Sequence, residues 1–227
     1  MNREAHIRRC ALVFVRAPQI GKVKTRLSGF LDKASVLGLY KNFTQDVIET
    51  VKGQAEHIRI CFHPSDQKDL ATGWLGNNFE YVPQKGKNLG ERMENAFLNA
   101  FSDRFTHVIL VGSDIPDLPE GIIKEAFAFL DSRKAVIGPA ADGGYYLVGF
   151  RDNMFVPQIF KNIPWGTDQV FKKTLSAFKT LHRSVHILPE WRDIDEYDDL
   201  LYFINKCKSG NAAARNTVGY LKKCRLI

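Results

Sequence analysis

Two continuous apolar runs place the strongest constraint on the fold of this 227-residue chain. Residues 10–15 read CALVFV and residues 108–111 read VILV, without the alternating polar residues of a strand that exposes one face to water. Such runs are typical of parallel strands that helices cover on both faces. Each run ends in a loop that contains glycine or proline, residues that interrupt regular structure. The sequence therefore predicts an α/β fold.

Apolar residues elsewhere in the chain alternate between strand-like and helix-like spacing. Strand-like runs cover residues 57–62, 79–82, 135–138 and 185–188, and helical spacing covers residues 33–51, 88–101, 121–130, 169–181 and 198–206. This alternation predicts a three-layer α/β/α sandwich. Asp-Gly-Gly at residues 142–144 is a hairpin signal, so the sheet is expected to be mixed but mostly parallel. We expect one domain over residues 1–227, with its core at about 9–206 and a peripheral tail at 207–227.

The composition, 44% hydrophobic and 25% charged, is that of an ordinary soluble globular protein. No apolar run approaches the roughly 20 residues that span a bilayer, so we expect no membrane segment. The four cysteines are far apart and form no CxxC pair, which favours a reducing, cytoplasmic setting. The formal charge of +7 suits either a nucleic acid or an anionic small molecule. Basic residues interleaved with aromatic ones, as in single-strand binders, are not evident, so we expect no nucleic-acid partner.

A cationic loop follows the first apolar run. It contains Ala17, Gly21, Lys22, Lys24 and Arg26. In open α/β sheets, ligands bind beyond the carboxyl ends of the strands, and both lysine and arginine can bind phosphate there. The loop is therefore predicted to bind the phosphates of a nucleotide, and the alternative is a basic loop exposed to solvent. It contains no GxxxxGK[ST] string, which disfavours a P-loop kinase.

Carboxylates follow the strand-like runs at two places. Asp114 comes directly after residues 108–111, and Asp117 lies three residues later. Asp193 and Asp195 follow the last strand-like run, and one of them is expected to face the same cleft as Asp114. Two carboxylates, together with phosphate oxygens and water, can form an octahedral site for Mg²⁺ or Mn²⁺. The alternative is that these acids form turns and cap a helix.

Three further loops contain residues that suit ligand binding. Gln84 and Gly86 follow a strand, where an amide can read the edge of a base and glycine permits close approach. An ordinary loop before a helix explains these two residues equally well. Asp142 projects from the Asp-Gly-Gly turn and could orient an acceptor hydroxyl, although the turn alone accounts for the motif. Trp165 either lines a pocket or packs in the core, and core packing is favoured.

Six stretches carry a resemblance to one known family: VFVRAPQIGKVKTRL, QKGKNLGERM, VGSDIPDLP, GPAADGGYYLVGF, IPWGTDQVF and RDIDEYDDL. In this order and spacing they resemble the DUF2064 family of the nucleotide-diphospho-sugar transferase superfamily, which has the glycosyltransferase-A fold. Relatives of that family include the phospholactate and molybdenum-cofactor guanylyltransferases. The resemblance runs from about Ala11 to Leu200 and implies a nucleotide bound over the first half of the sheet.

The resemblance also implies roles for individual residues. It implies phosphate contacts from Lys22, Lys24 and Arg26, base contacts near Gln84 and Gly86, a metal at Asp114 with Asp193 or Asp195, and an acceptor beside Asp142, Gly143 and Gly144. Lys24, Arg26, Asp114 and Asp142 are the expected catalytic residues, and Trp165 is a further candidate for acceptor binding.

These observations favour a magnesium-dependent transferase whose partners are a nucleotide and a small-molecule acceptor. The preferred hypothesis is nucleotidyl transfer from a nucleoside triphosphate to an anionic acceptor, because phosphoryl chemistry asks the protein mainly for positioning and charge. One alternative is a glycosyltransferase that uses a nucleotide-sugar donor. Another is a nucleotide-binding module without catalysis. The base, the acceptor and the oligomeric state stay open at this point.

Overall fold

The fold is built on one central sheet. A computed structural model describes residues 7–132, 134–210 and 213–227, and these form a seven-stranded sheet in the order β3-β2-β1-β4-β6-β5-β7. The strands are β1 (Arg9–Arg16), β2 (His57–His63), β3 (Glu80–Pro83), β4 (His107–Val111), β5 (Ala135–Pro139), β6 (Tyr145–Arg151) and β7 (Val185–Ile187). Strand β6 is antiparallel to β4 and β5, and the other strand pairs are parallel. The predicted mixed, mostly parallel sheet is confirmed.

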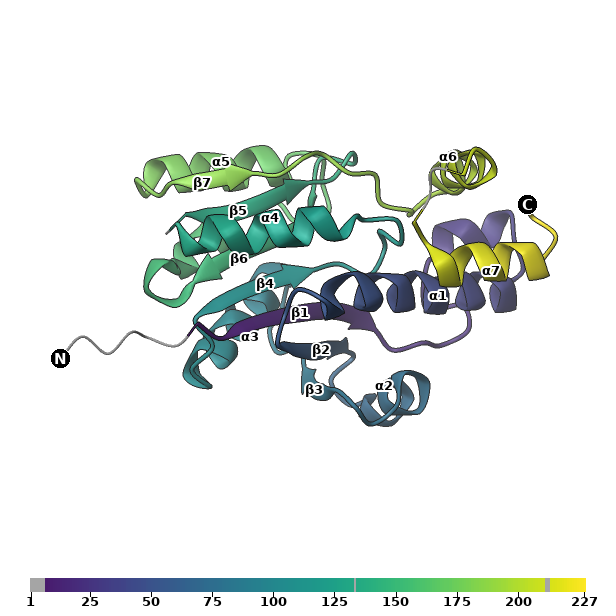
Figure 1. The fold of residues 1–227 in the computed structure, drawn as a ribbon, viewed down its shortest axis with the longest axis horizontal. Helices are drawn as coiled ribbons and strands as arrows, with labels where there is room; N and C mark the ends of the chain where they lie inside the picture. Colours follow the sequence, from purple (N-terminus) through teal and green to yellow (C-terminus); the bar gives the residue numbers. More distant parts are fainter. Residues whose placement is uncertain (1–6, 133, 211–212) are drawn as a thin grey trace.

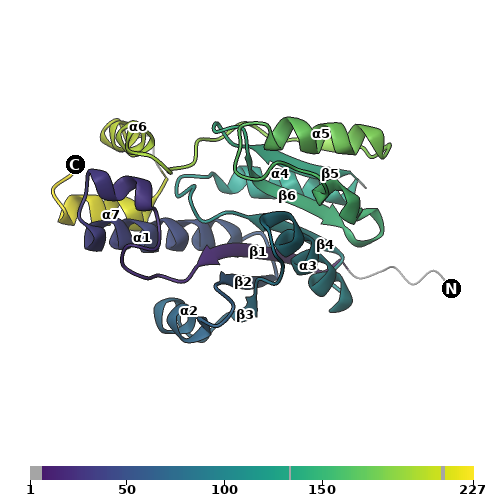
Figure 2. The same cartoon turned by 180° about the vertical axis from the view of Figure 1, so that it is seen from behind.

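Helices cover both faces of this sheet (Figures 1 and 2). Helices α1 (Lys33–Lys52), α2 (Lys68–Leu75) and α4 (Glu120–Asp131) pack on one face, and α3 (Leu89–Ser102) and α5 (Val170–Thr180) pack on the other. The short 3₁₀ helices are η1 (Thr25–Gly29), η2 (Asp152–Met154) and η3 (Pro157–Phe160). The three-layer sandwich is therefore confirmed. Within the described ranges, no helix combines the length and apolar character needed to cross a membrane.

Strand β1 shows why a continuous apolar run predicts this kind of fold. Its side chains alternate between the two helical layers, with Ala11 and Val13 in one core and Cys10 and Leu12 in the other. In a strand that is buried on both faces, a polar side chain would be buried without a hydrogen-bond partner. Such a strand therefore has to be continuously apolar. Parallel pairing with β2 and β4 places the carboxyl end of β1 at the same edge as theirs.

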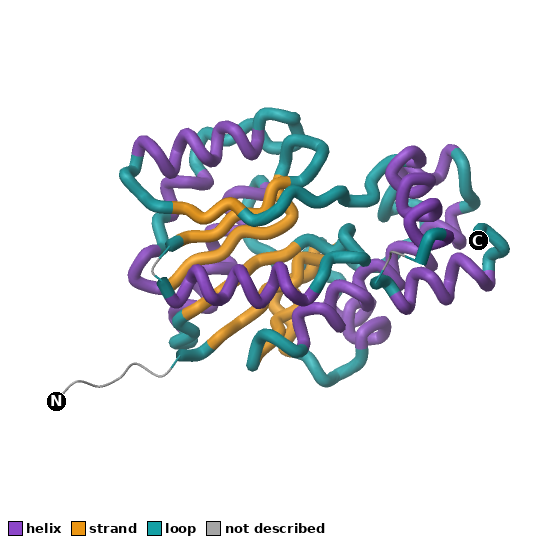
Figure 3. Tube along the Cα trace, turned by 45° about the horizontal axis from the view of Figure 1, so that its top comes forward, coloured by secondary structure: helices purple, strands orange, loops and turns teal. Residues whose placement is uncertain are grey.

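The C-terminal part of the chain forms a third core beyond the carboxyl ends of the strands (Figure 3). Helices α6 (Tyr197–Lys208) and α7 (Arg215–Lys223) pack with α1, and Ala214 and Leu221 are buried there. The expectation that residues 207–227 form a peripheral tail is therefore wrong for α7. This contact could not be predicted from the sequence, because α7 is mostly polar and buries only a narrow stripe of side chains.

The carboxylate of Asp46 on α1 fixes the start of α7. Its two oxygens accept hydrogen bonds from the backbone N–H and side chain of Asn216 and from the backbone N–H and hydroxyl of Thr217, at 2.6–2.9 Å. The first N–H groups of a helix lack partners within the helix. Asp46 therefore caps α7 from a distant part of the sequence.

Candidate functional site

Two hollows open side by side at the carboxyl edge of the sheet. The first, about 730 Å³, is here named the basic hollow, and its charged lining residues are Arg16, Lys22, Lys24, Arg26, Arg92, Asp114 and Asp195. The second, about 570 Å³, is named the acidic hollow, and its charged lining residues are Arg26, Asp114, Asp142, Asp168, Asp193, Asp195 and Glu196. Both are lined by Phe14, Arg26, Leu89, Asp114 and Asp195, which therefore form a shared wall.

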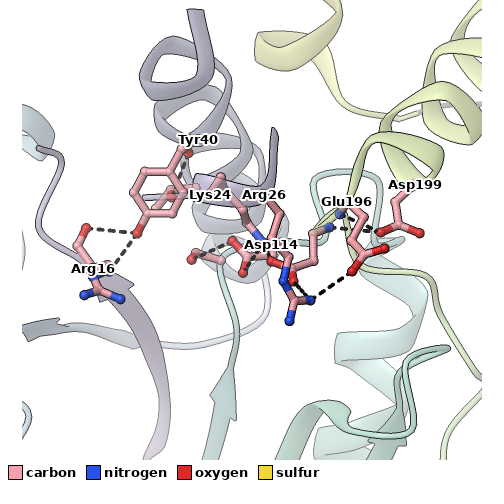
Figure 4. A network of polar contacts seen from close by, with 10 residues as sticks. Arg16, Lys24, Arg26, Tyr40, Asp114, Glu196 and Asp199 are labelled. Atoms are coloured by element: carbon pink, nitrogen blue, oxygen red, sulfur yellow. Dashed lines mark hydrogen bonds and ion pairs between the residues drawn. The ribbon is translucent and has the colours of Figure 1, made fainter. Parts of the chain in front are cut away.

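Lys24 lines the basic hollow and lies at the centre of an ion-pair network with residues of this wall (Figure 4). Its Nζ lies 2.7 Å from Oδ2 of Asp114 and 3.2 Å from Oδ1 of Asp195. Arg26 Nη1 lies 2.7 Å from the other oxygen of Asp195 and 3.1 Å from Glu196. Burial alone would lower the pKa of Lys24, whose side chain is only 5% exposed, but the carboxylates of Asp114 and Asp195 outweigh burial and raise it. Lys24 is therefore a fixed positive charge at the wall.

The backbone around the cationic loop is held in place by local structure. Lys24 has left-handed backbone angles, φ 45° and ψ 45°, immediately before η1. Such angles are uncommon in residues other than glycine and often mark functional positions. At the other end of the loop, the Tyr40 hydroxyl accepts a hydrogen bond from the Arg16 N–H and donates one to the Arg16 carbonyl. This pair of bonds fixes the point where β1 ends and the loop begins.

The segment after β7 brings the late acids to Asp114. Trp191 exchanges backbone hydrogen bonds with Pro139 and Ala141 at the end of β5, and the N–H of Ile194 then donates to the carbonyl of Asp114 at 2.9 Å. Ile194 is buried, so the acids on either side of it are held near the carboxyl end of β4. The expected approach of this segment to the Asp114 cleft is what the structure shows.

Asp117 has a different role from Asp114, although the two lie in one loop. Its side chain is buried, where it accepts a hydrogen bond from the Trp191 indole N–H at 2.9 Å and pairs with Lys206 of α6. It lines neither the basic nor the acidic hollow. Asp117 therefore anchors α6 and the late segment to the loop after β4.

Asp193 lies among other carboxylates. Burial above all, together with the nearby carboxylates of Asp142 and Asp114, raises its pKa to about 6, although Lys24 opposes this shift. A bound cation would relieve this concentration of negative charge. However, among the described residues no three acidic, histidine or cysteine side chains form a group that could hold a metal ion. The predicted site, Asp114 with either Asp193 or Asp195 and with phosphate oxygens and water, needs only two protein ligands and stays a prediction.

The Asp-Gly-Gly turn joins β5 to β6, as the hairpin signal predicts, and packs tightly on the loop after η3. Asp142 Oδ1 accepts the N–H of Gly144 at 2.7 Å, which closes the turn. Gly143 has φ +88°, and a Cβ there would lie 2.3 Å from the carbonyl oxygen of Asp168. The N–H of Phe171 donates to the Gly143 carbonyl at 2.8 Å. The turn thus holds Asp142 and Asp168 at one side of the acidic hollow.

Trp165 both lines the acidic hollow and packs against protein. A Cβ on Gly90 of α3 would lie 2.7 Å from its indole ring, and the Tyr145 ring meets it edge-on with centroids 6.2 Å apart. Both alternatives raised from the sequence, lining a pocket and packing against the core, therefore apply to Trp165.

The structure distributes the remaining predicted residues between the hollows and the framework. Gly21, Lys22 and Gln84 line the basic hollow, and Gly144 lines the acidic one. Gln84 uses its amide N–H groups on the backbone carbonyls of Cys61 and Val15, which fixes the loop after β3. Ala17, Gly86 and Gly143 line neither hollow. At Gly86 a Cβ would collide with the start of α3, which explains the glycine there by packing.

Several lining residues escaped the sequence analysis. Phe14 and Leu89 form part of the shared wall, and Arg92 and Asp168 line one hollow each. An apolar residue at a strand end has the same appearance in sequence as a core residue. Leu89, which is 44% exposed at the start of α3, carries no local signal that separates it from the core positions of that helix.

Replacing Gly143 with alanine should destabilise the protein by about 2–4 kcal/mol, because the new methyl group meets the Asp168 carbonyl in a left-handed backbone conformation. Urea unfolding measures the effect. Gly121→Ala is the matched control, since the space around Gly121 in α4 is open and alanine favours a helix. Equal stability of the two variants would contradict the tight contact of the turn.

A family model described as an uncharacterized protein conserved in bacteria (DUF2064) matches residues 47–167, more than half of the chain. The chain belongs to the DUF2064 family. A crystal structure from Desulfovibrio desulfuricans G20, designated with reservation a nucleotide-diphospho-sugar transferase, is 38% identical to it. That likeness has a TM-score of 0.86 and covers 95% of this chain and 94% of the other. The family indicated by the six stretches is thereby confirmed.

More distant relatives of this DUF2064 protein have named activities. The 2-phospho-L-lactate guanylyltransferase of Methanocaldococcus infernus is 30% identical over 131 residues, which cover 57% of this chain and 56% of that protein. The chain thus spans little more than half the length of this curated relative. A 4-diphosphocytidyl-2C-methyl-D-erythritol synthase structure from Anaerococcus prevotii DSM 20548 is 13% identical, with a TM-score of 0.55 over 95% of this chain and 96% of the other. At this low identity the likeness establishes the fold alone.

Proposed function

We propose that this DUF2064 protein is a nucleotidyltransferase that transfers a nucleoside monophosphate from a nucleoside triphosphate to a small-molecule acceptor. The observation that carries the proposal is the wall shared by the two hollows, which contains Arg26 and Asp114, with Lys24 of the basic hollow paired to Asp114. Phosphates in the basic hollow and an acceptor in the acidic hollow would meet at this wall. The guanylyltransferase name of a relative supports the same class of reaction and favours GTP as the donor.

The reaction divides naturally between the two hollows. An acceptor oxygen attacks the α-phosphorus, and pyrophosphate leaves. Lys22, Lys24 and Arg26 supply positive charge for the phosphates and for the negative charge that grows on the leaving group. The fixed position of Lys24 means that this stabilisation needs little rearrangement during the reaction.

We also propose that a divalent cation joins the nucleotide at Asp114 and Asp193. Carboxylate oxygens are the hard ligands that Mg²⁺ prefers, and Mg²⁺ is usually held by one or two carboxylates together with substrate phosphates and water. This coordination agrees with acids that crowd one another yet form no cage of three protein ligands. When bound, the cation would supply Lewis-acid activation of the α-phosphate.

The first experiment is thermal stabilisation by nucleoside triphosphates in the presence and absence of Mg²⁺. A ligand at 100 times its dissociation constant adds about 2.7 kcal/mol, which corresponds to roughly 5–10 °C for a chain of this size. We expect GTP with Mg²⁺ to give a shift of this size. The variant Lys22→Met should reduce the shift, whereas Lys172→Met on α5 should leave it unchanged. Absence of any shift with every triphosphate would contradict the proposal.

A glycosyltransferase with a nucleotide-sugar donor is the second candidate. The designation of the 38% identical structure favours it. The same basic hollow would then hold a nucleoside diphosphate as leaving group. A shift with a nucleotide-sugar, without one for the matching triphosphate, identifies this alternative.

A further inference from the structure

The two hollows differ in charge, and this difference bears on the acceptor. The basic hollow is lined by five cationic side chains and two carboxylates. The acidic hollow is lined by six carboxylates and one guanidinium, that of Arg26. A triphosphate suits the first of these and is disfavoured in the second. The acceptor is proposed to bind in the acidic hollow, and it therefore meets a negatively charged lining.

Pairing inside the protein does not neutralise the acidic hollow. Arg26 pairs with Asp195 and Glu196, and Lys24 pairs with Asp114 and Asp195. That leaves Asp142, Asp168 and Asp193 as further negative charges on the same hollow. Asp142 and Asp168 are exposed, and Asp193 is half-buried. Even with one divalent cation bound, carboxylates outnumber positive charges in the lining.

The walls of the acidic hollow are apolar and aromatic. Phe14, Met93, Tyr145 and Trp165 line it, and the last two rings meet edge-on. Aromatic faces beside carboxylates bind organic cations well, because both attract positive charge while the rings also contact the carbon skeleton. The close approach of Gly90 to Trp165 holds this wall rigid. The hollow thus combines its acids with an apolar and aromatic wall, and is more than a group of surface acids.

We infer that the acceptor is an amine-bearing alcohol, a cation, and not a phosphorylated or carboxylated anion. This inference rests on the proposed nucleotidyl transfer and replaces the anionic acceptor expected from the sequence. The alcohol oxygen forms the new bond to the α-phosphorus as the bond from that phosphorus to pyrophosphate breaks. The alcohol proton passes to the carboxylate of Asp142 and from there to solvent. The amine stays protonated among the remaining carboxylates, where an acceptor phosphate would be repelled.

A matched set of three-carbon probes tests the charge preference: aminopropanediol (a cation), glycerol (neutral) and glycerol phosphate (an anion). Each is titrated into the full chain, followed by ligand-observed NMR, after the basic hollow is filled with Mg²⁺ and a GTP analogue that has a methylene bridge between its α and β phosphorus atoms. We expect aminopropanediol to bind at least tenfold more tightly than glycerol phosphate, with glycerol between them. Glycerol or glycerol phosphate binding as tightly as the amine overturns the inference, and so does failure of all three to bind.

Substitutions locate the binding. Asp168→Asn removes one carboxylate from the acidic hollow and should weaken aminopropanediol about fivefold, as expected for one charge pair near a surface. Asp69→Asn removes an equivalent exposed charge from α2, outside both hollows, and should change nothing. Equal effects of the two variants would overturn the inference. If the GTP analogue does not bind, the proposed function fails, while titration of the free chain and of Asp168→Asn still tests the charge preference of the hollow.

Discussion

The variant Asp114→Asn should lower nucleotidyl transfer roughly a thousandfold while the protein stays folded, as the loss of one key electrostatic group typically does. Asp114 belongs to the wall between the hollows and contacts Lys24 there. The amide has the same shape as the carboxylate, and Lys24 keeps Asp195 as a partner. The change therefore removes a charge from the reacting centre without opening a cavity. Pyrophosphate release with GTP and aminopropanediol measures activity, and circular dichroism measures folding.

Asp117→Asn is the matched control, three residues away in the same loop. Asp117 is buried with Trp191 and Lys206 and lies outside both hollows. This variant should lower the free energy of unfolding by about 1–3 kcal/mol, because Lys206 loses its charged partner, and should keep turnover within a few fold. Full activity of Asp114→Asn, or equal losses of activity in both variants, would contradict the role given to Asp114.

The largest effect on stability is expected from Asp46→Ala, at about 3–4 kcal/mol. The substitution leaves four donors from Asn216 and Thr217 without their acceptor, and Thr217 is fully buried. Each unsatisfied buried donor costs about 1–3 kcal/mol, and the start of α7 also loses a favourable negative charge. Urea unfolding at neutral pH measures the change.

Glu49→Ala provides the comparison for Asp46, because Glu49 lies three residues along the same helix and is exposed. Its substitution should change the free energy of unfolding by less than about 0.5 kcal/mol. If Asp46→Ala were equally mild, α7 would contribute little to the fold, and the third core would have to be reconsidered.

The buried strands of the sheet could be predicted from the sequence, because each forms a local run of apolar residues. Residues 10–15 lie inside β1, and residues 108–111 cover all of β4 except its first residue. Both runs are apolar throughout, because only apolar side chains suit a strand that is covered on both faces. The position of β6 between β4 and β5 has no such local signal. The pairing of β6 with β4 joins residues 36 to 44 positions apart, as in Ile109 with Gly149.

Asp114 and Asp117 show where the sequence could not separate the site from the framework. Both are acids in one loop after a buried strand. What distinguishes them are the residues that approach from late in the chain: Trp191 and Lys206 reach Asp117, whereas Asp195 approaches Asp114 by way of Lys24. Contacts across 70 or more positions leave no trace in a local motif.

The strand order also bears on how the molecule assembles. Strand β5 is made before β6 yet touches β4 only through it, so β5 cannot join the growing sheet until β6 has been synthesised. We expect β5 and β6 to close first as a hairpin, a local and rapid event, and to dock onto β4 as a unit. The turn at residues 142–144, which carries Asp142 to the acidic hollow, is then also the point from which the second half of the sheet forms. A change in this turn should therefore affect the folding of the sheet as well as the position of Asp142.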